Sequence, residues 1–248
     1  DSVGALTSLL QRQAAELLIV MGGDGSVRAA LPALVETAVP LAIVPCGTMN
    51  LLAHDLDLPL EPAQAAGVPG CGRLRQIDIA EVNGEWFACH ALLGRSPYFT
   101  RLRERVRGST TARRLYLYGS MVLREIWRSW RSLYLVESEG RRRWVRAHTI
   151  AVSNNRYAQA MPGRFAKEKL DAGILGLYAI APEGGMSWLR LIARFFAGSW
   201  QADETTWCQD APEFSVRALS RSIRLSLDGE TVLLKSPLRF RIHSRALK

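Results

Sequence analysis

The stretch that decides the fold is residues 17–50, LLIVMGGDGSVRAALPALVETAVPLAIVPCGTMN, in which two short apolar runs each end in a glycine loop. Residues 17–21 form a continuous apolar run bounded at once by glycine, which predicts a strand buried on both faces. Apolar side chains recur at helical spacing over 27–37, and 41–44 predicts a second buried strand. Strand, helix and strand form the βαβ pattern of an open parallel sheet, which binds ligands at the carboxyl ends of its strands, where both loops lie.

The chemistry of the first loop, GGDGS, points to a phosphate group. Gly22, Gly23 and Gly25 let backbone N–H groups approach an anion closely. Ser26 can cap the helix that follows, whose N-terminus favours negative charge. Asp24 repels a phosphate unless a cation lies between them, so the loop predicts a Mg²⁺–nucleotide site in which Asp24 holds the metal or its waters. A plain turn before a helix cap is the alternative, and a second glycine loop at the matching place favours the nucleotide site.

Together, GGDGS and PCGTMNLLAHDLDLP resemble the diacylglycerol kinase catalytic-domain family, which includes bacterial lipid kinases and the sphingosine kinases. The segments DIAEVNGEWF, AVSNNRY, KLDAGIL and SLDGE follow in the order expected of that family. NAD kinases and 6-phosphofructokinases share a GGDG-type loop, but a GTxN loop that runs into a helix resembles the lipid kinases. The resemblance implies an α/β N-terminal nucleotide-binding domain with a parallel sheet, like that of NAD kinases, and a C-terminal β-rich, sandwich-like domain.

The resemblance also implies ATP and Mg²⁺ as cofactors and assigns residues to them. Those assigned to the nucleotide are Gly22, Gly23, Asp24, Gly25, Ser26, Gly47, Thr48 and Asn50. KLDAGIL resembles the family's L-D-D-G-L-L, where acidic residues and a backbone carbonyl hold a structural Mg²⁺. Leu170 and Asp171 therefore join Asp24 as the predicted metal ligands.

Three departures from the family pattern favour an alternative without catalysis. Ala172 replaces the second acid of the L-D-D-G motif, and Leu51 stands where many members have an Asp near the metal. The family's first strand, with its Asn-Pro-x-Ser-Gly-like loop, is not found before residue 17, so we expect a truncated or naturally shortened chain. These departures motivate a catalytically impaired, lipid-binding pseudokinase as an alternative.

The motif LDGE places two carboxylates, Asp228 and Glu230, between the predicted strands 222–227 and 231–234. On its own, Asp-Gly between two strands predicts an ordinary hairpin turn. The resemblance implies instead that this turn faces the phosphates and supplies the general base, which takes the proton from the lipid hydroxyl as it attacks phosphorus. The sequence does not decide between the two carboxylates. We favour Asp228 as the proton acceptor, with Glu230 as its partner or alternative.

The chain of 248 residues can hold one large core or two modest ones. Prolines and glycines between 59 and 72 predict a break in regular structure, and residues 75–81 and 85–91 predict a hairpin around Asn83-Gly84. We therefore expect an N-terminal domain over 1–76 and a β-rich lipid-binding domain over 77–248, with a return of the last strand to the first domain left open. The four cysteines show no CxxC spacing, which favours a reducing cytoplasm over a zinc site or a disulfide framework.

The positive charge is concentrated in residues 101–146, which hold 13 arginines against four glutamates, a balance of +9 that equals the net charge of the chain. Residues 115–130 show helical apolar spacing, with Arg124, Arg128 and Arg131 on another face. This pattern predicts a basic amphipathic helix that lies on an anionic membrane, or else a helix that covers the second domain with its arginines solvated. Nucleic acid is not expected, because no binding motif accompanies the charge. A second helix, 188–200, is strongly apolar and favours a core position or a groove for a lipid chain.

The sequence thus predicts an ATP-dependent lipid kinase that phosphorylates the hydroxyl of a diacylglycerol-like or sphingoid-like lipid. Two alternatives stay open, an NAD kinase-like activity on a soluble nucleotide and the pseudokinase. We expect a cytoplasmic protein that associates peripherally with membranes, because no apolar run reaches the roughly 18 residues needed to cross a bilayer. The oligomeric state is open, with a homodimer as one possibility.

Overall fold

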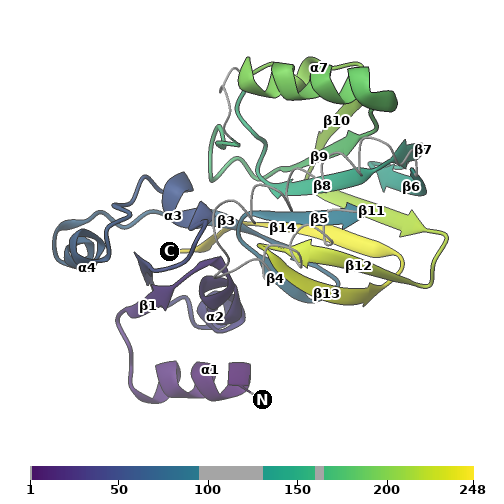
Figure 1. The fold of residues 1–248 in the computed structure, drawn as a ribbon. Helices are drawn as coiled ribbons and strands as arrows, with labels where there is room; N and C mark the ends of the chain where they lie inside the picture. The colour runs from purple at the N-terminus through teal and green to yellow at the C-terminus, as the bar shows by residue number, and fades with distance from the viewer. Residues whose placement is uncertain (1, 95–130, 160–164) are drawn as a thin grey trace, which may run out of the picture.

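The structure is a computed structural model that describes residues 2–94, 131–159 and 165–248. Figure 1 shows a small N-terminal α/β part beside a larger body of antiparallel strands. The first part contains α1 (Ser2–Arg12), β1 (Leu18–Gly22), α2 (Asp24–Thr37), β2 (Leu41–Pro45), α3 (Leu51–Asp55) and α4 (Pro62–Cys71). Strands β1 and β2 pair in parallel, from Leu18 opposite Leu41 to Gly22 opposite Pro45, so the predicted βαβ unit is confirmed.

Two expectations for this part are wrong. Strand β1 is not buried on both faces, because Ile19 and Met21 are 52% and 70% exposed while Leu18 and Val20 pack toward the core of α2. The prolines and glycines of 59–72 do not abolish regular structure, since α4 spans Pro62–Cys71. Pro62 occupies the first helical positions, where a missing N–H costs nothing, and the alanines that follow are good helix formers.

The second part is a sandwich of two six-stranded antiparallel sheets. Its elements are β3 (Ile77–Val82), β4 (Glu85–Phe87), β5 (His90–Gly94), β6 (Ser132–Ser138), β7 (Arg141–Ala147), β8 (Thr149–Asn154), β9 (Leu175–Ile180), α7 (Gly184–Phe196), η1 (Trp200–Ala202), β10 (Thr206–Ala211), β11 (Glu213–Ala218), β12 (Ser222–Leu227), β13 (Glu230–Lys235) and β14 (Leu238–Leu247). One sheet has the order β10-β9-β8-β5-β12-β13 and the other β4-β3-β14-β11-β6-β7. Between them lies an apolar core in which Phe87, Phe214 and Phe240 are fully buried. The predicted fold class is confirmed.

The Asn-Gly hairpin forms as predicted, with positive φ at Asn83 and Gly84. The strand expected over 85–91 is divided, however, because β4 lies in one sheet and β5 in the other. The chain crosses from sheet to sheet at Ala88 and Cys89, both buried. At this crossing a run of backbone N–H groups turns away from the hydrogen-bond ladders of both sheets. The crossing therefore matters for the site.

The two parts share a core. Ile77 and Ile79 of β3 and Leu247 of β14 join a cluster of buried residues with Leu31 and Leu34 of α2. At its end, the chain approaches β2, where the Leu41 N–H donates to the Lys248 carbonyl at 2.8 Å. This contact holds the end of β14 against the parallel sheet. The division of the chain at residue 76 stays a prediction.

The basic segment is described only in part, and the helix expected over 115–130, with Arg124 and Arg128, lies outside the described residues. Strands resume at Ser132, where β6 and β7 form a hairpin turned by Glu139 and Gly140, both with positive φ. Strand β7 is the edge of its sheet and carries four of the segment's arginines. Arg131 forms an ion pair with Glu183.

The predicted apolar helix near the C-terminal third is α7, which lies over the sandwich in Figure 1. Its Leu191 is buried, and Trp188 and Phe195 pack with it against an aromatic cluster that contains Trp200. The rest is not core, since Met186 and Phe196 are 79% and 65% exposed. No helix among the described residues is long and apolar enough to cross a membrane.

Candidate functional site

The two glycine loops touch each other backbone to backbone. They follow β1 and β2, and the parallel pairing of these strands brings them to one edge of the sheet. A Cβ added to Gly47 would lie 2.5 Å from the Gly23 Cα, and one added to Gly23 would lie 3.0 Å from the Gly47 Cα. Larger residues at either position would therefore force the loops apart.

Asn50 closes the second loop on itself. The Gly47 N–H donates to its Oδ1 at 2.9 Å, and its Nδ2 donates to the Gly47 carbonyl at 3.0 Å. Asn50 has φ 47°, a left-handed conformation that asparagine adopts more readily than most residues. The Gly47 N–H thus donates to Asn50, and the side chain of Asn50 sets the shape of the loop.

The first loop leads directly into α2, which begins at Asp24 with Gly23 as its N-cap. The N–H groups of Ser26 and Val27 both donate to the Gly23 carbonyl, at 3.0 and 3.2 Å. The expected cap by Ser26 is wrong, because the helix starts before this residue and no side chain caps it. An α-helix has no internal acceptor for its first N–H groups, so those of Asp24 and Gly25 can receive an anion.

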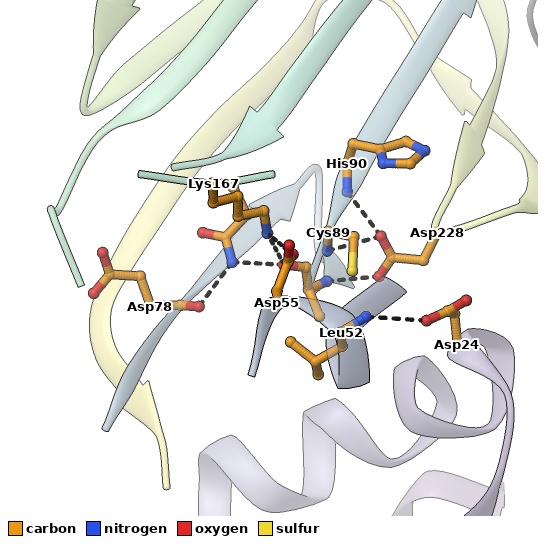
Figure 2. Close-up of polar contacts among 10 residues, drawn as sticks. Asp24, Leu52, Asp55, Asp78, Cys89, His90, Lys167 and Asp228 are labelled. Atoms are coloured by element: carbon orange, nitrogen blue, oxygen red, sulfur yellow. Dashed lines mark hydrogen bonds and ion pairs between the residues drawn. The ribbon is translucent and has the colours of Figure 1, made fainter. Parts of the chain in front are cut away.

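Asp24 connects the two loops. Its Oδ1 accepts a hydrogen bond of 3.3 Å from the Leu52 N–H, in the first turn of α3, as Figure 2 shows. Burial raises the pKa of Asp24, and the charge of Asp228 raises it further, while the Leu52 amide opposes this rise. Figure 2 draws Asp24 and Asp228 in one close-up around the start of α3, although the two belong to different parts of the fold.

Asp228 lies in the β12–β13 turn with φ 47°, and only 5% of its surface is exposed. Its Oδ2 accepts the Ala88 N–H at 2.6 Å, and its Oδ1 accepts the N–H groups of Cys89 and His90, each at 2.9 Å (Figure 2). The carboxylate therefore holds the crossing between β4 and β5. A carboxylate has about four acceptor positions, so three amides leave room for one more donor. Burial raises the pKa of Asp228, against the lowering effects of the three amides and of Lys167.

Glu230 is exposed and lies beside the first loop. Its Oε2 forms an ion pair of 2.9 Å with Arg28 of α2, and its Oε1 would clash with a Cβ on Gly25. Arg28 also pairs with Glu85 at 2.5 Å and donates to the Trp86 carbonyl at 3.0 Å. Arg28, to which no sequence motif points, thus connects the helix of the first loop to two hairpins of the sandwich.

The predicted structural metal ligands lie at another place. The Leu170 carbonyl accepts the Asp78 N–H at 2.8 Å, and Asp171 is exposed. The buried carboxylate here is that of Asp78, which accepts the N–H groups of Gly173 and Arg245 at 2.7 and 2.8 Å. Within the described ranges, no group of three or more His, Cys, Asp or Glu side chains is placed to hold a metal ion.

A buried polar group connects these regions. Asn154, 2% exposed, donates through Nδ2 to the carbonyls of Asp78 and Ala88, at 2.8 and 2.7 Å. Lys167 donates to the same Ala88 carbonyl at 3.1 Å and pairs with Asp55 of α3 at 3.2 Å (Figure 2). Asn154 belongs to the AVSNNRY segment that resembles the family, and Asp55 belongs to the second quoted stretch, PCGTMNLLAHDLDLP, whereas nothing in the sequence pointed to Lys167.

Residues 2–82 match the family model described as the diacylglycerol kinase catalytic domain. The family resemblance is confirmed over this part of the chain. Over 85 residues the chain is 38% identical to a "Diacylglycerol kinase" of Mycobacterium tuberculosis, which is 32% of this chain and 28% of that protein. Over 72 residues it is 42% identical to a "Probable lipid kinase YegS-like" of Pseudomonas aeruginosa, which is 28% of this chain and 24% of that protein. The alignments thus span about a quarter of these relatives.

The fold likeness extends over nearly the whole chain. A solved structure of a diacylglycerol kinase from Bacillus anthracis str. Sterne superposes with a TM-score of 0.69 at 17% identity, covering 98% of this chain and 80% of that one. A second structure from that strain gives a TM-score of 0.73 at 20% identity, covering 99% and 81%. The diacylglycerol kinase family match includes both glycine loops. Asp171, Asp228 and Glu230 lie beyond residue 82, so their roles stay predictions.

Proposed function

We propose that the protein is an ATP-dependent lipid kinase that phosphorylates the hydroxyl of a diacylglycerol-like or sphingoid-like lipid. The observation that carries this proposal is the packing of the DGE turn of the sandwich against the first glycine loop, where Glu230 pairs with Arg28 of α2 and reaches Gly25, in a chain with a diacylglycerol kinase family match. Asp24 thus supplies one carboxylate within the first glycine loop. The DGE turn brings further carboxylates to this loop from the sandwich, which is the part of the fold that differs from a plain nucleotide-binding domain.

The first loop suits a nucleotide phosphate with its metal. The open N–H groups of Asp24 and Gly25 at the start of α2 offer donors and a favourable helix dipole. Mg²⁺ in such sites is held by one or two carboxylates together with substrate phosphates, which agrees with Asp24 as the single carboxylate of the loop. When bound, Mg²⁺–ATP would supply the phosphoryl group and neutralise its charge.

Asp228 would act as the proton acceptor. A base in phosphoryl transfer needs a fixed position and a pKa nearer neutrality than that of a free carboxylate. The three amides fix the position, and burial raises the pKa. Glu230 would be the partner, since its ion pair with Arg28 holds the DGE turn against α2. Leu170 and Asp171 would hold a second, structural metal ion only with further ligands, because they offer one carbonyl and one exposed carboxylate.

We further propose that the protein docks peripherally on anionic membranes in the cytoplasm. Residues alternate along an edge strand, so Arg142, Trp144 and Arg146 of β7 share its outer face, and Trp144 is 59% exposed. An exposed Trp between two arginines suits the headgroup region of a bilayer. The exposed apolar side chains of α7 are the candidate contacts for lipid chains.

The test is transfer of radiolabelled phosphate from ATP to a total lipid extract, with NAD as a parallel acceptor. A labelled lipid whose formation requires Mg²⁺ and ATP would support the proposal. Label on NAD alone would assign the soluble-nucleotide activity instead. ATP binding without transfer to either acceptor would contradict the kinase and identify a pseudokinase.

A further inference from the structure

We propose that α3 and the buried Lys167–Asp55 ion pair form a positioning element that sets the placement of Asp228 relative to the first glycine loop. This inference rests on the proposed kinase function. The element consists of Asp24, α3, Asp55, Lys167 and Ala88, and it is called here the α3 link. Apart from Asp24 it lies outside the glycine loops, and its members Lys167 and Ala88 belong to none of the sequence motifs quoted above.

The first contact of the link is at the start of α3. This helix has only five residues, and so short a helix is not stable alone in water. Its Leu52 N–H donates to Asp24 of the first loop, and the Leu52 side chain is 2% exposed. The position of α3 is therefore fixed from outside, at this end by the carboxylate of the phosphate loop.

The second contact is at the end of α3, where Asp55 pairs with Lys167 at 3.2 Å. The two side chains are 10% and 3% exposed. Lys167 belongs to the sandwich, since its backbone bridges to Tyr157 just after β8. The pair thus joins the short helix to the other part of the fold, through charges that water barely reaches.

The third contact brings the link to Asp228. Lys167 also donates to the Ala88 carbonyl at 3.1 Å, and the N–H of the same residue donates to Asp228 at 2.6 Å. Figure 2 shows these contacts in one view, from Asp24 through α3 to Asp228. A shift of Lys167 therefore moves the residue that holds the carboxylate.

Stability alone does not account for this pair. Replacing both members of a buried ion pair by apolar groups is often neutral or stabilising, whereas removing one member is strongly destabilising. Of the ion pairs resolved in 2–94, 131–159 and 165–248, only this one has both side chains exposed by 10% or less. A charged pair differs from an apolar pair in that it fixes the orientation of its side chains, because Lys167 must point at both Asp55 and the Ala88 carbonyl.

The experiment compares Lys167→Met, Asp55→Leu and the double variant, with Lys169→Met as an exposed neighbouring control. Each single change should lower the melting temperature, and the double variant should regain most of that loss. Its kcat should nevertheless stay at least about tenfold below wild type, with the KM for ATP within about twofold, because small misplacements of a reacting group are costly. The control should match wild type in all three quantities. A double variant with wild-type kcat would overturn the proposal.

Hydrogen exchange provides the second readout. Below the unfolding transition of the double variant, the amides of Ala88, Cys89 and His90 should exchange faster than in wild type, together with that of Leu52. Unchanged exchange at these four amides would overturn the proposal whether or not the melting temperature recovers. If the wild-type protein transfers no phosphate, the kinase proposal fails, while the exchange measurement still decides whether the link holds Asp228 in place.

Discussion

Replacing Asp228 by Asn should separate the catalytic from the structural part of this residue. The change keeps the size of the side chain but exchanges one acceptor oxygen for an NH₂ group. With the new NH₂ in the place of Oδ2, the N–H groups of Cys89 and His90 keep their acceptor, while that of Ala88 faces a donor. The opposite orientation loses two amides, so the loss of one is the minimum.

The magnitude follows from that single unsatisfied amide. A buried donor without a partner costs about 1–3 kcal/mol of unfolding free energy. For a chain of this size each kcal/mol lowers the melting temperature by about 2–4 °C, which gives a drop of about 2–12 °C. Loss of the proton acceptor should in addition lower kcat by about 10²–10⁴-fold. ATP affinity should change little, because Asp228 lies outside the glycine loops.

The assay is thermal unfolding together with steady-state transfer of labelled phosphate at a temperature where both proteins are folded. Glu230→Gln is the control, since it removes a carboxylate of the same turn whose partner, Arg28, lies on α2. An Asp228→Asn variant that melts earlier but retains wild-type kcat would refute catalysis by this carboxylate. The residue would then serve only to hold the β4–β5 crossing.

Three further predictions concern the loops and the charge. Gly47→Ala should abolish ATP binding and lower the melting temperature, because its Cβ meets the Gly23 backbone; Gly67→Ala, with open space around it, should do neither, and equal binding by both variants would contradict the loop assignment. Asp24→Asn can still accept the hydrogen bond from α3 and should lose turnover with little change in stability. Asp24→Ala should lose turnover and stability alike. Turnover by the Asn variant would place the metal elsewhere. Replacing the outer face of β7 should weaken sedimentation with anionic vesicles, most of all at low salt, and an unchanged bound fraction would exclude docking through this strand. The variant set is Arg142→Gln, Trp144→Ala and Arg146→Gln, with Arg73→Gln and Arg75→Gln as the exposed control pair.

A last prediction concerns pH. Because burial raises the folded-state pKa of Asp228, the folded protein binds this proton more tightly than the unfolded chain, whose Asp pKa is about 3.9. The stability that this group contributes is therefore fully present below about pH 3.9 and is lost as the pH rises through the folded-state pKa. The melting-temperature gap between wild type and Asp228→Asn should accordingly be wider at about pH 4 than at neutral pH. A gap that widens toward neutral pH would contradict the raised pKa.

Features that depend on residues adjacent in the sequence could be predicted from the sequence alone. The βαβ unit follows from two apolar runs that end in glycines, since a short apolar run bounded by glycine fits a strand and not a helix. The Asn83-Gly84 turn follows from residues that accept positive φ. Predictions that required knowledge of the tertiary surroundings of a residue were less accurate. Whether both faces of β1 are covered depends on which helices pack there, and the alternation of exposed Ile19 and Met21 with half-buried neighbours has no signal in a uniformly apolar run.

The site was predicted as a set of loops, and only the tertiary structure decided how its side chains are connected. Asp24 meets an amide 28 residues away, and Asp228 meets the Ala88 N–H from 140 residues away. Such partners depend on how β4 leaves one sheet and β5 enters the other, which is set by the register of strands distant in the chain. The pair of Lys167 and Asp55 is the clearest case, since each would be taken for a solvated surface charge in its local sequence. Burial distinguishes these two charges from ordinary solvated charges, and burial is a property of the packed molecule that no local pattern encodes.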